Sequence, residues 1–235
     1  MGKLKNVVKK IVYREYVNSE TYIQHLRNLG CSIGDRTKIY EPRNTYIDIT
    51  RPWLINIGND VNITRGVTIL THGYDNAVIA KLYHELMGSS GKVVIGNNVF
   101  IGMNSTVLKG VSIGNNVIIG ANSLVNKNIP DNSVVAGNPC RVIMSVDEYY
   151  HKRTAEYMDE AKEMAIEYYH RYKKVPPINV FYEFYPLFLE RNSDIAVANG
   201  FTFKVEGEEN VFFKTSPKFN GYEEFLKWCG IPQNN

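Results

Sequence analysis

Large aliphatic residues recur every six positions through the middle of the chain. From residue 95 the sequence divides into six blocks that open on Ile95, Ile101, Val107, Ile113, Ile119 and Val125. The same phase appears upstream at Ile33, Ile39, Ile57, Ile63 and Ile69. A period of six matches neither a helix face, whose neighbours recur every three or four residues, nor an ordinary strand, which alternates every two. It predicts short strands joined by tight turns, with one large apolar side chain of each block pointing inward.

Three such blocks make one triangular coil of roughly 18 residues, and successive coils stack as parallel sheets. Residues that tolerate unusual turn geometry stand between the blocks, for example Asn97-Asn98, Asn115-Asn116, Gly110 and Gly120. The run resembles the hexapeptide repeat of left-handed β-helix proteins. That resemblance implies a mainly β protein whose residues 31–144 form a left-handed parallel β-helix.

The N-terminal flank, residues 1–30, shows helical patterning. Leu4, Val7, Val8 and neighbouring apolar residues share one face of a first helix with basic residues around it, and a second helix is predicted from Ser19 to Gly30. An open β-helix end exposes strand edges and core, so we interpret residues 1–30 as a helical cap. The alternative is that the basic first helix contacts a membrane surface.

The C-terminal flank, residues 145–235, begins with a capping box. Ser145 and Glu148 have the spacing of that motif and predict a helix that ends near Lys174, before Pro176-Pro177. The chain beyond is rich in aromatic residues, which either build a small core or stack on sugar rings. We favour the small core for this extension.

The repeat is interrupted after Ile69, where residues 73–92 form an inserted loop. Insertions into a tight solenoid are commonly binding loops. His72 stands at the base of the insertion on rigid scaffold, and histidine is suited to proton transfer near neutral pH. His72 is therefore the candidate general base. Asp75, inside the loop, is a candidate to orient His72 or to contact an acceptor, although a solvated loop acid fits the sequence equally well.

Composition and charge narrow the function classes. The 235 residues carry a net charge of only +3, which argues against nucleic acid as the main partner. No apolar run approaches the roughly 18 residues of a membrane span, and the N-terminus lacks the apolar stretch of a signal peptide. Cys31, Cys140 and Cys229 are widely spaced and form no CxxC pair, so a reducing cytoplasm is the simplest setting.

A metal site is not predicted. Zinc enzymes with this kind of fold need three histidines that meet at a subunit interface, and the sequence has no histidine between His84 and His151. Nucleotidyltransferases with β-helix domains carry a separate nucleotide-binding domain, for which the chain has no room.

The segments THGYD, VVIGNNVFIG and IGANSLVNKNIPDNSVVAGNPCRVI closely resemble the galactoside and maltose O-acetyltransferases and their polysaccharide-modifying relatives. The resemblance covers about residues 33–143. It implies a homotrimer in which acetyl-CoA, the co-substrate, lies in a groove between subunits. It also implies that His72 takes the proton from a sugar hydroxyl, which attacks the thioester directly, and that no metal is required. The longer C-terminal region resembles enzymes of surface-polysaccharide synthesis and favours a glycan or its precursor as acceptor.

The same resemblance assigns further residues. Ungapped counting back through the repeat places the acceptor-binding asparagine at Asn44. Asp75 in the loop is the second candidate for acceptor binding. The residues implied for coenzyme A are Met103, Ala121, Asn126, Lys127 and Arg141. Met103 stands where the family often has serine, so only its backbone N–H is expected to face the oxyanion.

Three other functions fit parts of the pattern. An amino-sugar N-acetyltransferase needs the same base and the same groove, and a serine or antibiotic O-acetyltransferase uses the same fold. A glycan-binding scaffold without activity is the third. The sequence favours an O-acetyltransferase acting on a saccharide.

Overall fold

The computed structural model describes residues 14–203 and 207–232. The chain divides into two compact units, residues 1–150 and 151–235, each with its own hydrophobic core. The first helix predicted near the N-terminus falls largely on residues 1–13 and lies outside the described residues.

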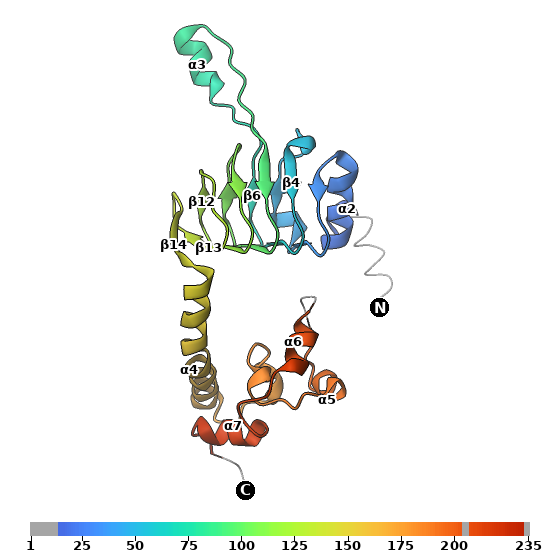
Figure 1. Ribbon diagram of the computed structural model, residues 1–235, viewed down its shortest axis with the longest axis vertical. Coiled ribbons are helices and arrows are strands. Elements are labelled where there is room, and N and C mark those ends of the chain that lie inside the picture. Colours follow the sequence, from blue (N-terminus) through green and yellow to red (C-terminus); the bar gives the residue numbers. More distant parts are fainter. Residues whose placement is uncertain (1–13, 204–206, 233–235) are drawn as a thin grey trace. The chain divides into compact units, whose positions relative to one another are not determined.

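The first unit is a left-handed parallel β-helix built from three sheets (Figure 1). Sheet A contains β1 (Ser32–Ile33), β4 (Ile55–Ile57), β7 (Val93–Ile95) and β10 (Ser112–Ile113). Sheet B contains β2 (Lys38–Ile39), β5 (Asn62–Ile63), β8 (Val99–Ile101), β11 (Val117–Ile119), β13 (Ser133–Ala136) and β14 (Arg141–Ser145). Sheet C contains β3 (Tyr46–Ile47), β6 (Thr68–Ile69), β9 (Thr106–Val107) and β12 (Leu124–Val125).

The predicted six-residue period is confirmed by the strand register. Ile57 pairs with Ile95, Ile63 with Ile101 and Ile69 with Val107, one pair in each sheet. These aliphatic side chains are buried and stack along the axis as a continuous core. All neighbouring strands are parallel except β13 and β14, which are antiparallel.

Asparagine ladders and glycines close the turns. Asn97 Oδ1 accepts from the N–H of Asn59, and Asn115 Oδ1 accepts from the N–H of Asn97, at 2.8 Å in both cases. Glycine is required where coils approach most closely, because a Cβ at Gly96 would lie 2.6 Å from the carbonyl oxygen of Gly114. The turns thus fix the spacing between coils as well as the direction of the chain.

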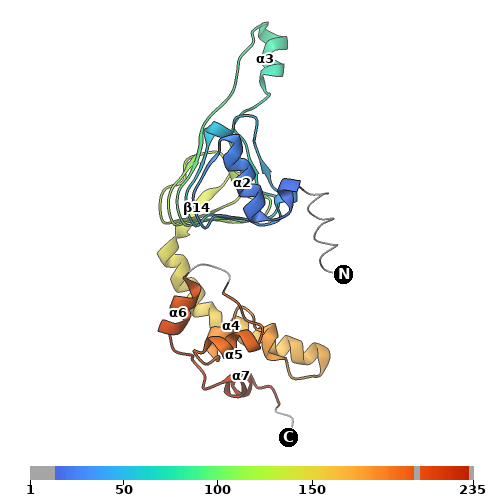
Figure 2. The ribbon, with the colours of Figure 1, turned by 90° about the vertical axis from the view of Figure 1, so that its right-hand side faces the viewer.

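Helix α2 (Ser19–Leu29) covers one end of the β-helix (Figure 2). Asn18 accepts from the N–H of Thr21 at its start, and Gly30, with φ 111°, ends it, as predicted. Tyr22, Ile23 and Leu26 are buried in the same core as the β-helix isoleucines. The helix therefore shields the open strand edges and core from water.

Residues 73–92 form an arm that projects from the β-helix (Figures 1 and 2). The sequence predicted only a loop here, whereas the structure contains helix α3 (Asn76–Tyr83), every residue of which is at least partly exposed. At the base of the arm, His72 and Ser90 form an antiparallel bridge.

Helix α4 (Val146–Tyr172) begins at the predicted capping box. The N–H and the hydroxyl of Ser145 donate to Glu148 Oε2, and the N–H of Glu148 donates to Ser145 Oγ. The rest of the second unit comprises η4 (Ile178–Val180), η5 (Tyr185–Leu187), α5 (Ser193–Ala198), α6 (Glu208–Lys214) and α7 (Tyr222–Trp228).

The aromatic residues of the second unit mostly build a core. Phe181, Phe188, Phe201 and Phe225 are fully buried, so packing is the main role of these rings. None of the helices that the structure describes is both long and apolar enough to cross a membrane.

Candidate active site

Asp48 is a fully buried carboxylate directly after strand β3. The register of sheet C pairs Ile47 with Ile69, and the N–H of Asp48 donates to the carbonyl oxygen of Ile69. This pairing brings the Asp48 side chain next to Thr71, whose N–H and hydroxyl donate to Asp48 Oδ2. The N–H and hydroxyl of Thr50 donate to Asp48 Oδ1 at 3.0 and 2.6 Å.

His72 is held by this carboxylate. Its Nδ1 lies 2.5 Å from Asp48 Oδ2 and 3.4 Å from Thr50 Oγ1. The side chain is only 8% exposed, and the ring of Tyr74 meets it edge-on with the centroids 4.7 Å apart. Because an ionised carboxylate only accepts, Nδ1 carries the proton that it donates to Asp48, and the lone pair of the neutral ring is on Nε2.

The charge of Asp48 is fixed by its surroundings. Burial alone would raise the pKa of this carboxyl, but hydrogen bonds from Thr50, Thr71 and His72 outweigh it and hold the pKa well below its usual range. Asp48 is therefore ionised at neutral pH. A histidine oriented by an ionised carboxylate, with its second nitrogen directed elsewhere, is an arrangement suited to general-base chemistry.

The turn that carries Thr50 also supplies a polar group near the pair and an exposed aromatic residue. Arg51 Nη1 donates to Thr50 Oγ1 at 3.1 Å, which places a guanidinium near the imidazole. Trp53, in η3 (Pro52–Leu54), is 67% exposed, and Tyr74 is also exposed beside His72. Tyr74 therefore offers an accessible aromatic surface next to the buried His72–Asp48 pair.

Neither of the two acceptor candidates, Asn44 and Asp75, takes part in the hydrogen bonds of the His72–Asp48 pair. Asn44 ends η2 (Pro42–Asn44), in the turn before β3, and its Nδ2 donates to Glu41 Oε2. Asp75 is exposed at the start of α3 in the arm. The carboxylate that orients His72 is Asp48, which the sequence did not single out, and not Asp75.

Met103 and Ala121 lie in stacked turns between sheets B and C. The N–H of Asn122 donates to the carbonyl oxygen of Met103 at 2.8 Å, so the two turns are in direct contact. Gly102 permits this approach, since a Cβ there would lie 2.5 Å from the Ala121 nitrogen. The structure therefore brings these two predicted residues together.

Asn126 and Lys127 lie on the other side of sheet C, whereas Arg141 begins β14 in sheet B, where it pairs with Ala136. Asn126 and Lys127 are exposed after β12, at the same corner of the triangle that carries His72 after β6. The N–H of Cys140 donates to the carbonyl oxygen of Leu124, the first residue of β12, so Arg141 follows a residue that lies over the start of that strand. The coenzyme A candidates thus border sheet C on both sides. Among the described residues, no three His, Cys, Asp or Glu side chains gather closely enough to hold a metal ion.

The spacing of the strands explains why Asp48 escaped notice. The step from Ile39 to Ile47 is eight residues and the step from Ile47 to Ile57 is ten, instead of six each. The two excesses together equal one block, so the aliphatic phase resumes at Ile57 and conceals both insertions. The larger excess forms the turn that carries Asp48 and Thr50, and counting without gaps misplaces residues in this coil.

Comparisons with known proteins agree with one another and identify relatives among the hexapeptide-repeat transferases. The family model for bacterial transferase hexapeptide repeats (six repeats) matches residues 92–127. Protein CapG of Staphylococcus aureus is 42% identical over 159 residues, which cover 67% of this chain and 88% of that protein. The galactoside O-acetyltransferase of Escherichia coli K12 is 38% identical over 128 residues, which cover 49% of this chain and 60% of the relative.

The solved structures that resemble this chain include a maltose O-acetyltransferase from Clostridium difficile 630. It has 31% identity and a TM-score of 0.41, and the match covers 61% of this chain and 83% of the other. A galactoside acetyltransferase in complex with coenzyme A has 28% identity and a TM-score of 0.43. The match covers 61% of this chain and 82% of that chain. Because these TM-scores are below 0.5, the relationship rests on the sequence relatives.

Acidification tests the charge of Asp48. Its pKa is lower in the folded than in the unfolded chain, so its stabilising contribution is complete above about pH 5 and is lost as the pH falls below about 4. Asp48→Asn lacks this dependence. We expect the free energy of unfolding of the wild type to fall more steeply with acid than that of the variant, by up to about 1.4 kcal/mol per pH unit.

Denaturant unfolding between about pH 5 and pH 3 at one protein concentration measures the difference. Asp75→Asn is the matched control, since it removes an exposed carboxylate from the neighbouring arm and should follow the wild type. Parallel curves for the wild type and Asp48→Asn would show that Asp48 is not preferentially ionised in the folded protein.

Proposed function

This chain belongs to the hexapeptide-repeat acetyltransferases, and from that membership we propose that it transfers the acetyl group of acetyl-CoA to a hydroxyl group of a saccharide. The observation that carries the proposal is the His72–Asp48 pair at the base of the arm. The galactoside O-acetyltransferase relative supports a sugar hydroxyl as the acceptor.

The reaction follows from the position of the proton on His72. Nδ1 donates to Asp48, so Nε2 accepts the proton of the acceptor hydroxyl as its oxygen attacks the thioester carbonyl carbon. The C–O bond forms, the C–S bond breaks, and the leaving sulfur takes the proton back from Nε2. Asp48 remains ionised throughout and stabilises the transient imidazolium.

Sheet C organises the proposed coenzyme A contacts. We assign the backbone N–H of Met103 to the developing oxyanion and Ala121 to the groove wall, since their turns are stacked. The exposed cations Lys127 and Arg141, with Asn126 beside them, suit the phosphates of coenzyme A. Asn44 and Asp75 remain the proposed acceptor contacts.

We further propose that the protein is a homotrimer with composite sites. The flat faces of a triangular β-helix can pack around a threefold axis and give closed symmetry. His72 and Met103 lie at different corners of the triangle, one after and one before a sheet C strand. A groove between two subunits lets one chain supply the base and a neighbour supply part of the thioester contacts.

The central experiment is the replacement of His72 by alanine. We expect kcat to fall by roughly 10²–10⁴-fold because the general base is lost, with little change in the KM for acetyl-CoA. His84→Ala is the matched control, because His84 is an exposed histidine at the end of α3 and should retain activity.

The assay measures acetyl transfer from labelled acetyl-CoA to a panel of saccharides, amino sugars, serine and polysaccharide fragments. Full activity of His72→Ala on the preferred acceptor would refute the proposed base. Exclusive use of amines would establish N-acetylation instead of O-acetylation.

Salt dependence tests the phosphate contacts. Lys127→Ala should weaken acetyl-CoA binding by about three- to tenfold at low ionic strength, since one charge-assisted contact is lost. Added salt should weaken wild-type binding more than that of the variant, because screening acts on the missing charge. Calorimetric titration measures both, with the exposed Lys218→Ala in the second unit as the control. Identical salt slopes for the wild type and Lys127→Ala would place the phosphates elsewhere.

Mixed trimers test the composite site. His72→Ala and Ala121→Trp, each inactive alone, should regain activity when unfolded and refolded together. Random mixing restores roughly one quarter of the sites if the two residues come from different chains. Light scattering first checks the mass of the assembly. A monomer would rule out the trimer, and an inactive mixed trimer would place both residues in one chain.

A further inference from the structure

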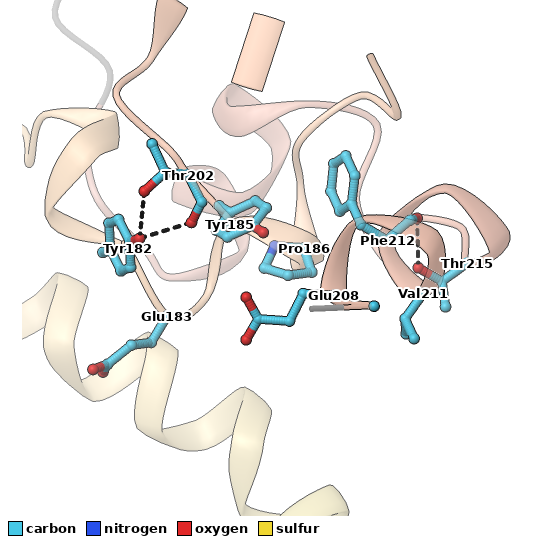
Figure 3. A pocket seen from close by; sticks show the side chains of 10 residues that line it. Tyr182, Glu183, Tyr185, Pro186, Thr202, Glu208, Val211, Phe212 and Thr215 are labelled. Carbon is cyan, nitrogen blue, oxygen red and sulfur yellow. Dashed lines mark hydrogen bonds between the residues drawn. The ribbon is translucent and has the colours of Figure 1, made fainter. Parts of the chain in front are cut away.

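The second unit contains an aromatic pocket with a volume of about 800 Å³ (Figure 3). Its walls include Tyr182, Tyr185, Pro186, Thr202, Glu208 and Phe212. A volume of this size is within the range of small-molecule sites, about 300–1,000 Å³. His72 and Asp48 belong to the first unit, so the proposed transfer reaction gives this pocket no role.

The walls of the aromatic pocket are held together by contacts of Arg191. Arg191 Nη2 donates to the carbonyl oxygen of Pro186 at 2.7 Å, and its Nε donates to that of Thr215 at 3.0 Å. The guanidinium also lies 4.3 Å from the centre of the Phe212 ring. Arg191 therefore ties the segment around η5 to the end of α6, the two segments between which the pocket lies.

Aromatic rings provide the apolar surface. Tyr185 stacks on the buried Phe201, with centroids 4.6 Å apart and planes inclined by 20°, and it also contacts Phe212. Tyr185 is nevertheless partly exposed to the pocket. A ring whose orientation is fixed by a partner, and which retains accessible surface, is a preorganised platform for the C–H face of a ligand.

Hydroxyl and carboxylate groups surround this platform. The Tyr182 hydroxyl donates to the carbonyl oxygen of Thr202 at 2.8 Å and lies 3.0 Å from its hydroxyl. Figure 3 shows the Glu208 side chain extending towards Tyr185 and Pro186. Burial and the negative charge of Glu208 raise the pKa of the Tyr185 phenol.

The charge of the pocket restricts its ligand. Glu183 and Glu208 both line it, and the lining residues within the described ranges include no lysine, arginine or histidine. An acidic ligand would meet repulsion from these carboxylates. A ligand with both an apolar face and hydroxyl groups matches this lining, because the hydroxyl groups can donate to the carboxylate oxygens while the apolar face packs on the rings.

We propose that the aromatic pocket binds a saccharide that carries no acidic groups. The C–H face of a pyranose ring packs on the Tyr185 side of the pocket, and its hydroxyl groups donate to Glu208 and exchange hydrogen bonds with the tyrosine and threonine hydroxyls. The volume accommodates more than one sugar unit. This binding requires neither His72 nor acetyl-CoA, so it stands independently of the proposed transfer reaction.

The test is an array of immobilised neutral, amino and acidic oligosaccharides, probed with the 235-residue protein in the absence of acetyl-CoA. The best glycan is then titrated in solution by calorimetry, with choline as a probe for simple cation binding. We expect neutral or amino oligosaccharides to bind. Glu208→Gln should weaken that binding about tenfold through the loss of a charged acceptor.

Matched variants locate the binding. Glu209→Gln changes the next residue of α6, which lies outside the pocket lining, and should bind as the wild type does. Tyr185→Phe keeps the ring and removes one hydroxyl, so it should weaken binding severalfold without unfolding the unit. His72→Ala should bind normally, which separates the pocket from an acceptor held at the candidate active site.

Four outcomes would overturn the proposal. They are no saccharide binding anywhere on the array, a preference for acidic glycans, tighter binding of choline than of any sugar, and saccharide binding that Glu208→Gln and Tyr185→Phe leave unchanged in folded protein. A loss of binding caused by His72→Ala alone would assign the saccharide to the first unit.

Discussion

The parallel pairing of one coil on the next is the constraint on which the rest of this structure depends. Ile47 pairs with Ile69 in sheet C, and this register alone brings Asp48 beside Thr71 and His72. A shift of the first coil by two residues would bury a different side chain there and leave the imidazole without its carboxylate. The same pairing stacks the turns of Met103 and Ala121. The geometry of the candidate active site is therefore a consequence of backbone hydrogen bonding between coils.

The six-residue period predicted the strands from Ile57 to Ile69 and from Ile95 to Val125 because each aliphatic residue has one inward position. It also located His72 at the break in the repeat. Asp48 was not predicted, because two insertions in the first coil compensate each other and leave the phase intact. A buried carboxylate in an enlarged turn has no periodic signal. Only the pairing of the neighbouring coil reveals its partner.

Some features of this structure depend on contacts between residues close in the sequence, and others depend on contacts between distant segments. The capping box at Ser145 and Glu148 fixed the start of α4 through contacts three residues apart. The aromatic pocket depends instead on Arg191 reaching Pro186 and Thr215, contacts that connect separate segments. Composition predicted that aromatic rings would pack together. It did not distinguish the rings that fill the core, such as Phe181, from those that face a cavity, such as Tyr185.

Both the turn that contains Asp48 and the arm at residues 73–92 leave the β-helix at the corner after a sheet C strand. Chain length at this corner varies without any change in the isoleucine stack, since pairing resumes in register on the far side. The residues that build the stacked core are consequently separate from those of the turn and the arm. Such a scaffold can change the length and sequence of one loop, while the residues that fold it and the His72–Asp48 pair stay as they are.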